Sequence, residues 1–208
     1  MSYTIYGAPG SGSGIVEAAC AELGVSYQVK DLDARNDEHR GDAYAGLNPH
    51  RKMPTLTTDD GEVLTESVAI VVTLDERHPE GKLLPTPGSK ERAQALRWMV
   101  FLASELYPLV EIVDYPQRLA TDETAAKELR ARAEALWRER WRIVEAHVAG
   151  SPFFLPSGFS AADLFVTKLY VWLDKEWRGE NLPKIEALSQ AVRARPSLAS
   201  VWSRHIRE

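Results

Sequence analysis

Cysteine is nearly absent from this sequence, since Cys20 is the only one among 208 residues. A single cysteine excludes both an internal disulfide and a CxxC redox pair, so any thiol chemistry must come from a ligand or from Cys20 itself. Cys20 lies among alanine and valine residues. We therefore interpret it as a small buried apolar residue rather than as a nucleophile.

Long apolar runs are absent as well. No stretch approaches the roughly 18 consecutive apolar residues that cross a bilayer, and the N-terminal residues lack the basic and apolar regions of a secretory signal peptide. We therefore expect a cytoplasmic protein with no membrane partner. The five histidines show no metal-ligand spacing with one another or with Cys20, so no metal site is predicted.

Basic residues are not in excess, because the sequence has 25 Lys and Arg against 30 Asp and Glu, a net charge of −5. Nucleic-acid binding needs a basic stripe that displaces counterions from phosphates, so we expect no nucleic-acid partner. Up to Glu80 there are 6 Lys and Arg against 14 Asp and Glu, and after it 19 against 16. This uneven charge indicates a chain of two parts.

Short apolar stretches and turn residues predict the order βαβ followed by ββα in the first part. Gly24 stops the first helix, and an acidic turn joins the last two strands into a hairpin. A short helix is expected in the polar region between the two halves. The predicted elements lie at residues 3–7, 15–23, 27–29, 54–57, 62–65 and 67–77.

Prolines between residues 79 and 87 break regular structure and mark a linker. Beyond it, apolar residues recur at helical spacing over 96–113 and 129–148, which predicts two long helices that pack as a pair. Ser160 and Asp163 predict the capped start of a third helix. Shorter helices are expected near residues 183–194 and 197–205. The predicted fold class is α/β plus all-α, with a domain at residues 1–80, a linker at 81–89 and a helical domain at 90–208.

The first candidate site is the Gly-Ser-Gly-Ser-Gly turn at residues 10–14, between a strand and a helix. Amides and hydroxyls near a helix N-terminus favour an anion. The spacing matches neither GxGxxG nor the phosphate loop, and no acidic ribose partner follows about 20 residues on, so nucleotide binding is disfavoured. An anion-binding turn and a plain turn whose serines cap the helix both stay open.

The second candidate site lies within residues 48–70. Pro54 cannot donate to a sheet ladder, which suggests a special turn, and a cis peptide there would leave the backbone of Met53 facing a ligand. Glu66 and Ser67 open a helix directly after a strand. Ser67 offers a hydroxyl and an amide to a carboxylate, and Glu66 accepts from an ammonium group. An α-amino acid terminus would satisfy both.

This second segment resembles the glutathione-site signature of the glutathione S-transferase family. The element order resembles that family's architecture over essentially the whole chain, and residues 160–163 resemble the capping box of an inner helix in its second domain. Bacterial members of the beta-like or serine type are the most similar in pattern. The resemblance implies a thioredoxin-like glutathione-binding domain, then an all-helical domain, in a homodimer.

The resemblance also implies which residues bind glutathione. The backbone of Met53 would pair with the cysteinyl part, whereas Arg51 and Lys52 would meet the glycyl carboxylate. Ser104 and Glu105, on a helix like that of beta-class members, would reach across the dimer to the γ-glutamyl group. The full implied glutathione site is Arg51, Lys52, Met53, Pro54, Glu66, Ser67, Ser104 and Glu105. An asparagine of that family helix is replaced here by Val100.

Thiolate formation requires help, because an ordinary thiol with a pKa of about 8.5 is mostly protonated at neutral pH. A hydroxyl donor and a helix N-terminus stabilise the anion. Alignment with the Pro-Gly of beta-class enzymes puts Gly12 at their cysteine position and Ser13 just after it, whereas the tyrosine-glycine start resembles serine-type members and points to Ser11. Both serines remain candidates, and we favour Ser11.

The predicted function is a detoxifying glutathione transferase that joins the glutathione thiolate to an electrophilic, hydrophobic small molecule. The missing catalytic cysteine argues against a mixed-disulfide mechanism. Glutathione is the co-substrate, and we expect no metal or organic cofactor. Tyr107, Tyr115 and Trp172 are predicted to line the pocket of the second substrate. The alternatives are a glutathione-dependent isomerase or dehalogenase, or a non-catalytic binding module on the same fold.

Overall fold

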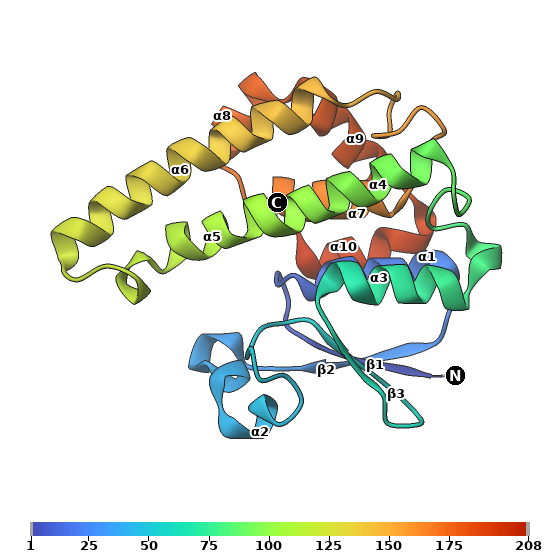
Figure 1. The fold of residues 1–208 in the computed structure, drawn as a ribbon, viewed down its shortest axis with the longest axis horizontal. Helices are drawn as coiled ribbons and strands as arrows, with labels where there is room; N and C mark the ends of the chain where they lie inside the picture. The colour runs from blue at the N-terminus through green and yellow to red at the C-terminus, as the bar shows by residue number, and fades with distance from the viewer. Residues whose placement is uncertain (1, 207–208) are drawn as a thin grey trace. The chain divides into compact units, whose positions relative to one another are not determined.

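The computed structural model describes residues 2–206 and is drawn in Figure 1. The chain divides into two compact units. Unit 1 contains the residues up to Ser89 together with those from Ala191 onward, and unit 2 contains residues 90–190. The C-terminal segment, which the sequence pattern assigned to the helical domain, thus groups with unit 1. Within residues 2–206, no helix has the combined length and apolar character that crossing a membrane requires.

Unit 1 is built on a four-stranded mixed sheet with the order β2-β1-β3-β4. β1 runs parallel to β2 and antiparallel to β3, and β3 runs antiparallel to β4. Alternate residues of β1, Tyr3, Ile5 and Gly7, are buried, as expected for a central strand with one covered face. The strands are β1 (Tyr3–Gly7), β2 (Tyr27–Asp31), β3 (Thr55–Thr58) and β4 (Val63–Thr65).

Helices α1, α3 and α10 lie on one face of this sheet, and α1 contacts both of the others (Figure 1). α1 begins two residues before the predicted start and ends at Leu23, where Gly24 follows with φ +66°. The predicted βαβ–ββα order is confirmed. The helices of unit 1 are α1 (Ser13–Leu23), η1 (Ala34–Asn36), η2 (Glu38–Arg40), α2 (Asp42–Ala45), α3 (Ser67–Arg77), η3 (Pro79–Gly81), η6 (Pro196–Leu198) and α10 (Ala199–His205).

Unit 2 is helical, as predicted, and α5 packs against α6. One predicted long helix is divided by a π-helical turn just before Pro108. Proline has no N–H to donate to the carbonyl four residues earlier, which here is that of Ser104, so the helix widens locally. The helices are α4 (Lys90–Phe101), the π-helix η4 (Leu102–Leu106), α5 (Tyr107–Asp114), η5 (Pro116–Arg118), α6 (Glu123–Ala146), α7 (Ala161–Tyr170), α8 (Lys175–Asn181) and α9 (Pro183–Arg193), which continues past the end of unit 2.

The predicted capping box at the start of α7 is present. The N–H of Ser160 donates to Asp163 Oδ2 at 2.7 Å, and the N–H of Phe154 donates to Asp163 Oδ1 at 2.7 Å. Asp163 is fully buried. Burial raises the pKa of its carboxyl to about 6, against the opposing effect of the backbone hydrogen bonds. One carboxylate therefore ties the loop before α7 to the first turn of that helix.

Candidate functional site

The strand register brings three predicted site segments to one end of the sheet of unit 1. Tyr6 near the end of β1 pairs with Thr55 at the start of β3, and Thr55 pairs with Thr65 at the end of β4. The last residues of β1 and β4 and the first residues of β3 therefore lie at the same end of the sheet. The glycine-rich turn follows the end of β1, the Met53–Pro54 bond directly precedes β3, and the Glu66–Ser67 pair follows the end of β4.

Ser11 is the second residue of the glycine-rich turn. Ser11 Oγ accepts hydrogen bonds from the N–H groups of Ala8, at 3.1 Å, and Ser13, at 3.2 Å. The N–H of Ser11 donates to the carbonyl of Ala8 at 3.0 Å. Gly10 adopts φ +79°, where a side chain would be strained. These bonds fix the Ser11 hydroxyl beside the start of α1, and its side chain is only half-buried.

Ser13 occupies a different environment, because it is fully buried. Its hydroxyl donates to Glu17 Oε1 at 2.9 Å, and its oxygen lies 2.9 Å from Ser11 Oγ. A serine has one hydroxyl proton. Since the proton of Ser13 is given to Glu17, Ser11 is the donor in the bond between the two serines. Of the two candidate serines, Ser11 is the one with solvent-accessible surface.

Glu17, buried behind the turn, has no counterpart in the sequence-based prediction. It accepts from Ser13, from His205 Nε2 at 2.9 Å and from Arg204 Nε at 3.2 Å. Burial alone would raise the pKa of Glu17, but the hydrogen bonds from His205 and Ser13 and the charge of Arg204 outweigh it and hold the pKa below the ordinary value. A carboxylate among the apolar residues of the first half of α1 was the available sequence signal, but its partners lie 187 and 188 residues away.

The Met53–Pro54 peptide bond is cis. The sheet ladder begins at Thr55, so the N–H and C=O groups of Met53 lie outside it. The preceding carbonyl, that of Lys52, accepts from Tyr44 Oη at 2.9 Å and from Asn48 Nδ2 at 2.7 Å. Tyr44 and Asn48 are buried; Tyr44 lies outside the predicted site segment, and Asn48 begins that segment without a predicted role. Together they hold the loop that presents the Met53 backbone.

Glu66 and Arg51 are both in the left-handed region, with φ +65° and +56°. Such values are uncommon for residues with side chains and concentrate at functional sites. The carboxylate of Glu66 is 72 % exposed and lies 3.7 Å from His50 Nδ1. Arg51 pairs with Asp42 at 2.8 Å, whereas Lys52 is exposed. The amide of Ser67 opens α3 next to Glu66.

Unit 2 holds the remaining predicted residues. Ser104 and Glu105 are exposed in the π-helical turn, and Glu105 accepts from Arg140 Nε at 3.2 Å. The rings of Tyr107 and Trp172 meet edge to face, with centroids 5.6 Å apart. Tyr115, predicted for the same pocket, lies at the opposite end of α5 from Tyr107.

Tyr107 also carries a buried hydroxyl that has no hydrogen-bond partner among residues 2–206. Burial raises the pKa of this hydroxyl above its ordinary range. The Trp172 ring also lies 4.8 Å from Lys168 Nζ. Because their rings are in contact, Tyr107 and Trp172 are the two predicted pocket residues that lie together in unit 2.

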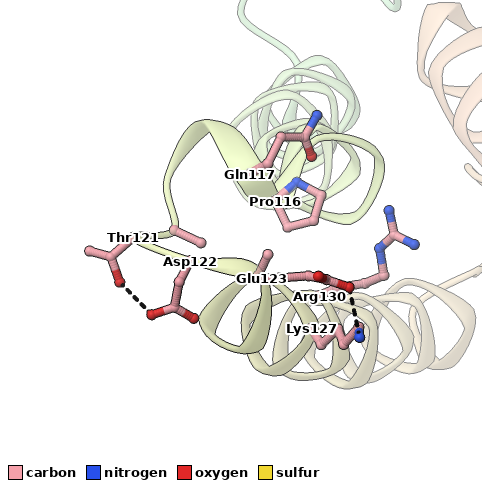
Figure 2. A pocket seen from close by; sticks show the side chains of 9 residues that line it. Pro116, Gln117, Thr121, Asp122, Glu123, Lys127 and Arg130 are labelled. Atoms are coloured by element: carbon pink, nitrogen blue, oxygen red, sulfur yellow. Dashed lines mark hydrogen bonds and ion pairs between the residues drawn. The ribbon is translucent and has the colours of Figure 1, made fainter.

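A cavity of about 510 Å³ lies elsewhere in unit 2, where η5 meets the start of α6 (Figure 2). Four of its polar side chains bond in pairs, since Lys127 pairs with Glu123 at 2.9 Å and Thr121 donates to Asp122. It contains none of the predicted site residues. The lining residues are Pro116, Gln117, Ala120, Thr121, Asp122, Glu123, Ala126, Lys127 and Arg130. In the part of the chain that the structure describes, no group of three or more His, Cys, Asp or Glu side chains could hold a metal ion.

Comparison with known proteins gives one consistent result. Residues 13–77 match the family model described as glutathione S-transferase, N-terminal domain. The GST-like protein YncG of Escherichia coli is 28 % identical over 97 % of each chain. Maleylacetoacetate isomerase of Dictyostelium discoideum is 38 % identical over 96 residues, which cover 45 % of this chain and 43 % of the isomerase. The structure of a glutathione transferase homolog from Sulfitobacter, with bound glutathione, is 26 % identical over 99 % of each chain, with a TM-score of 0.91.

Proposed function

The chain belongs to the glutathione S-transferase family, and on that premise we propose that unit 1 binds glutathione and that the protein transfers the glutathione thiolate to a hydrophobic electrophile. The observation that carries the proposal is the convergence of three segments at one end of the sheet. Ser11, the Met53 backbone and the Glu66–Ser67 pair are each suited to a different part of the tripeptide.

Each part of glutathione has a chemically matched group. The exposed carboxylate of Glu66 accepts from the γ-glutamyl ammonium, and the amide of Ser67 at the N-terminus of α3 donates to the adjoining carboxylate. The Met53 backbone, outside the sheet ladder, pairs with the cysteinyl unit. The exposed ammonium of Lys52 faces the glycyl carboxylate, with Arg51 beside it.

Ser11 supplies the hydroxyl that stabilises the thiolate. An anionic sulfur is a stronger acceptor than a hydroxyl oxygen, so the Ser11 proton turns from Ser13 to the sulfur when glutathione binds. The N-terminus of α1 adds its partial positive charge. The thiolate then attacks an electrophilic carbon, a carbon–sulfur bond forms, and the leaving group departs with its electron pair. Ser13 supports Ser11 from the buried side.

Glutathione-dependent isomerisation is the second candidate, favoured by the similarity to maleylacetoacetate isomerase. In that reaction the same thiolate adds to a double bond and is released again, so glutathione is regenerated. Consumption of glutathione therefore distinguishes the two candidates. A transferase removes free thiol in proportion to product, and an isomerase leaves it unchanged.

We propose in addition a cytoplasmic, detoxifying homodimer in which Ser104 and Glu105 of one subunit reach the γ-glutamyl group bound to the other. Both side chains are exposed on unit 2, which supports this role. Sedimentation equilibrium gives the mass of the assembly. Mixed dimers of one Glu105→Ala subunit and one wild-type subunit then test whether Glu105 of one subunit contributes to the glutathione site of the other.

The test of function is retention on immobilised glutathione, followed by thiol transfer to chlorodinitrobenzene. Glu66→Ala removes the acceptor for the γ-glutamyl ammonium, so affinity should fall about 10- to 100-fold. Ser67→Ala removes the hydroxyl that Ser67 offers to the adjoining carboxylate but keeps the backbone amide, so its loss should be smaller. Ser26→Ala is the matched control, because Ser26 is exposed beside Tyr27 at the opposite end of the sheet. Retention equal in all four proteins, or no retention of the wild type, contradicts the proposal.

A further inference from the structure

A chain of hydrogen bonds connects the glycine-rich turn to the last helix of unit 1. The N–H of Gly10 donates to His205 Nδ1 at 3.2 Å, and His205 Nε2 lies 2.9 Å from Glu17 Oε1. Glu17 Oε1 also accepts from the Ser13 hydroxyl at 2.9 Å. Gly10 and Ser13 flank Ser11 in the sequence, so the turn is held on both sides of Ser11.

The His205 ring has one orientation in this network. Nδ1 accepts from the Gly10 amide and therefore carries no proton, so the proton on Nε2 is donated to Glu17. The side chain of His205 is completely buried. A Cβ on Gly14 would lie 2.9 Å from the ring, so the ring packs directly on the backbone of α1 at Gly14. The close contact with Gly14 and the two hydrogen bonds thus hold the His205 ring in the same position.

α10 is itself anchored, which makes His205 a firm support. Arg204 donates to Glu17 Oε2 at 3.2 Å and to Asp31 Oδ2 at 3.1 Å. At the start of the same segment, Arg195 Nε donates to Glu22 Oε2 at 3.2 Å, and Glu22 is nearly buried. The segment from residue 195 to residue 205 is therefore bonded to α1 at two places and to the end of β2.

The turn needs such support because of its composition. Three of the five residues from 10 to 14 are glycine, which has the largest conformational freedom of any residue. An unanchored turn of this kind would present the Ser11 hydroxyl in many positions. A displacement of about 1 Å of a catalytic group reduces rate by up to about 100-fold.

We propose that His205 is a positioning residue that holds Gly10 directly and Ser13 through Glu17, and so keeps the Ser11 hydroxyl where the glutathione sulfur binds. The inference rests on the function proposed above. His205 does not touch glutathione in this arrangement. It acts through the turn, from a position 194 residues after Ser11 in the sequence.

Two substitutions separate the two bonds of His205. The amide oxygen of His205→Asn takes the place of Nδ1 and keeps an acceptor for Gly10. The amide nitrogen of His205→Gln takes the place of Nε2 and keeps a donor for Glu17. His147→Asn in unit 2, where the ring bonds to the carbonyl of Ile143, is the matched control. Near-ultraviolet circular dichroism confirms that each variant is folded.

The measured quantity is the pKa of the bound glutathione thiol, from the ultraviolet absorbance of the thiolate. For His205→Gln we expect the thiol pKa of bound glutathione to rise by about one unit, so that at a pH below this pKa the thiolate fraction falls about tenfold. The affinity for glutathione should change less than about threefold. His205→Asn should show the smaller rise and His147→Asn none. A folded His205→Gln variant with the wild-type thiol pKa and kcat overturns the inference.

A double-mutant cycle with Ser11→Ala tests the route of the effect. If His205 acts through Ser11, His205→Gln changes the thiol pKa in the wild type and leaves it unchanged in the Ser11→Ala background. Equal changes in both backgrounds overturn the inference. If the wild type binds glutathione without lowering its thiol pKa, the proposed function fails first, and this inference with it.

Discussion

Replacing Gly14 with alanine puts a methyl group against the imidazole of His205. The new Cβ would lie 2.9, 3.0 and 3.2 Å from three atoms of the ring. Carbon atoms pack best at about 3.5–4.0 Å, so the ring or the helix must move by about 0.5–1 Å. The bond from the Gly10 amide to Nδ1 is already 3.2 Å long, at the limit of good geometry, and such a movement breaks it.

The expected cost of Gly14→Ala combines three effects. Overpacking a tight contact costs about 1–3 kcal/mol, and the lost hydrogen bond costs about 1 kcal/mol. Alanine in place of glycine in a helix returns up to about 1 kcal/mol. We therefore expect the free energy of unfolding to fall by about 1–3 kcal/mol, and the thiol pKa of bound glutathione to rise as it does in His205→Gln.

Urea denaturation, followed by circular dichroism, measures this free energy. Gly179→Ala in α8 is the matched control, because a Cβ there meets no atom within 4 Å. It should raise stability by about 0.5–1 kcal/mol through helix propensity alone. A Gly14→Ala protein at least as stable as the wild type would refute the reasoning, since it would mean that the ring moves without cost.

Three further outcomes are expected. Asp163→Ala leaves the buried N–H groups of Phe154 and Ser160 without acceptors, and urea denaturation should show a loss of about 2–5 kcal/mol. Tyr107→Phe removes a buried hydroxyl that lacks a partner among the described residues, so the same assay should show a gain of up to about 1 kcal/mol. Glu17 has a folded-state pKa below its ordinary 4.5, so its contribution to stability is present above pH 4.5 and is lost as the pH falls through the folded pKa. Glu17→Gln should therefore show a smaller loss of stability than the wild type in that acid range.

The features that the sequence predicted are those with local causes. α3 begins at Ser67 and ends at Arg77, as predicted, because the signals for its start and end lie within the segment. The capping box of α7 has its partners Ser160 and Asp163 three residues apart. The order of strands and helices along unit 1 likewise follows from short patterns, and the cis bond before Pro54 was expected from the local sequence around that proline.

The features that were missed have distant causes. α1 begins at Ser13 rather than at residue 15, because the buried Ser13 and Gly14 are held by contacts with Glu17 and with His205 at the far end of the sequence. No spacing rule connects a histidine to a carboxylate 188 residues away. The π-helical turn did have a local signal, Pro108 inside an apolar stripe, which predicts a distortion without giving its type.

The composition of unit 1 from two separate stretches of sequence also has a consequence for biosynthesis. A ribosome delivers the strands and α1 first, then the whole of residues 90–190, and only afterwards Arg195, Arg204 and His205. Until then Glu17 and Glu22 lack the C-terminal partners that bond to them, and the Gly10 N–H lacks its acceptor on His205. A nascent chain therefore contains Ser11, Met53, Glu66 and Ser67 long before it can hold the Ser11 turn in place. Completion of the site coincides with translation of the last few codons before residue 206, so a stalled nascent chain should lower the thiol pKa of bound glutathione only after His205 has left the exit tunnel.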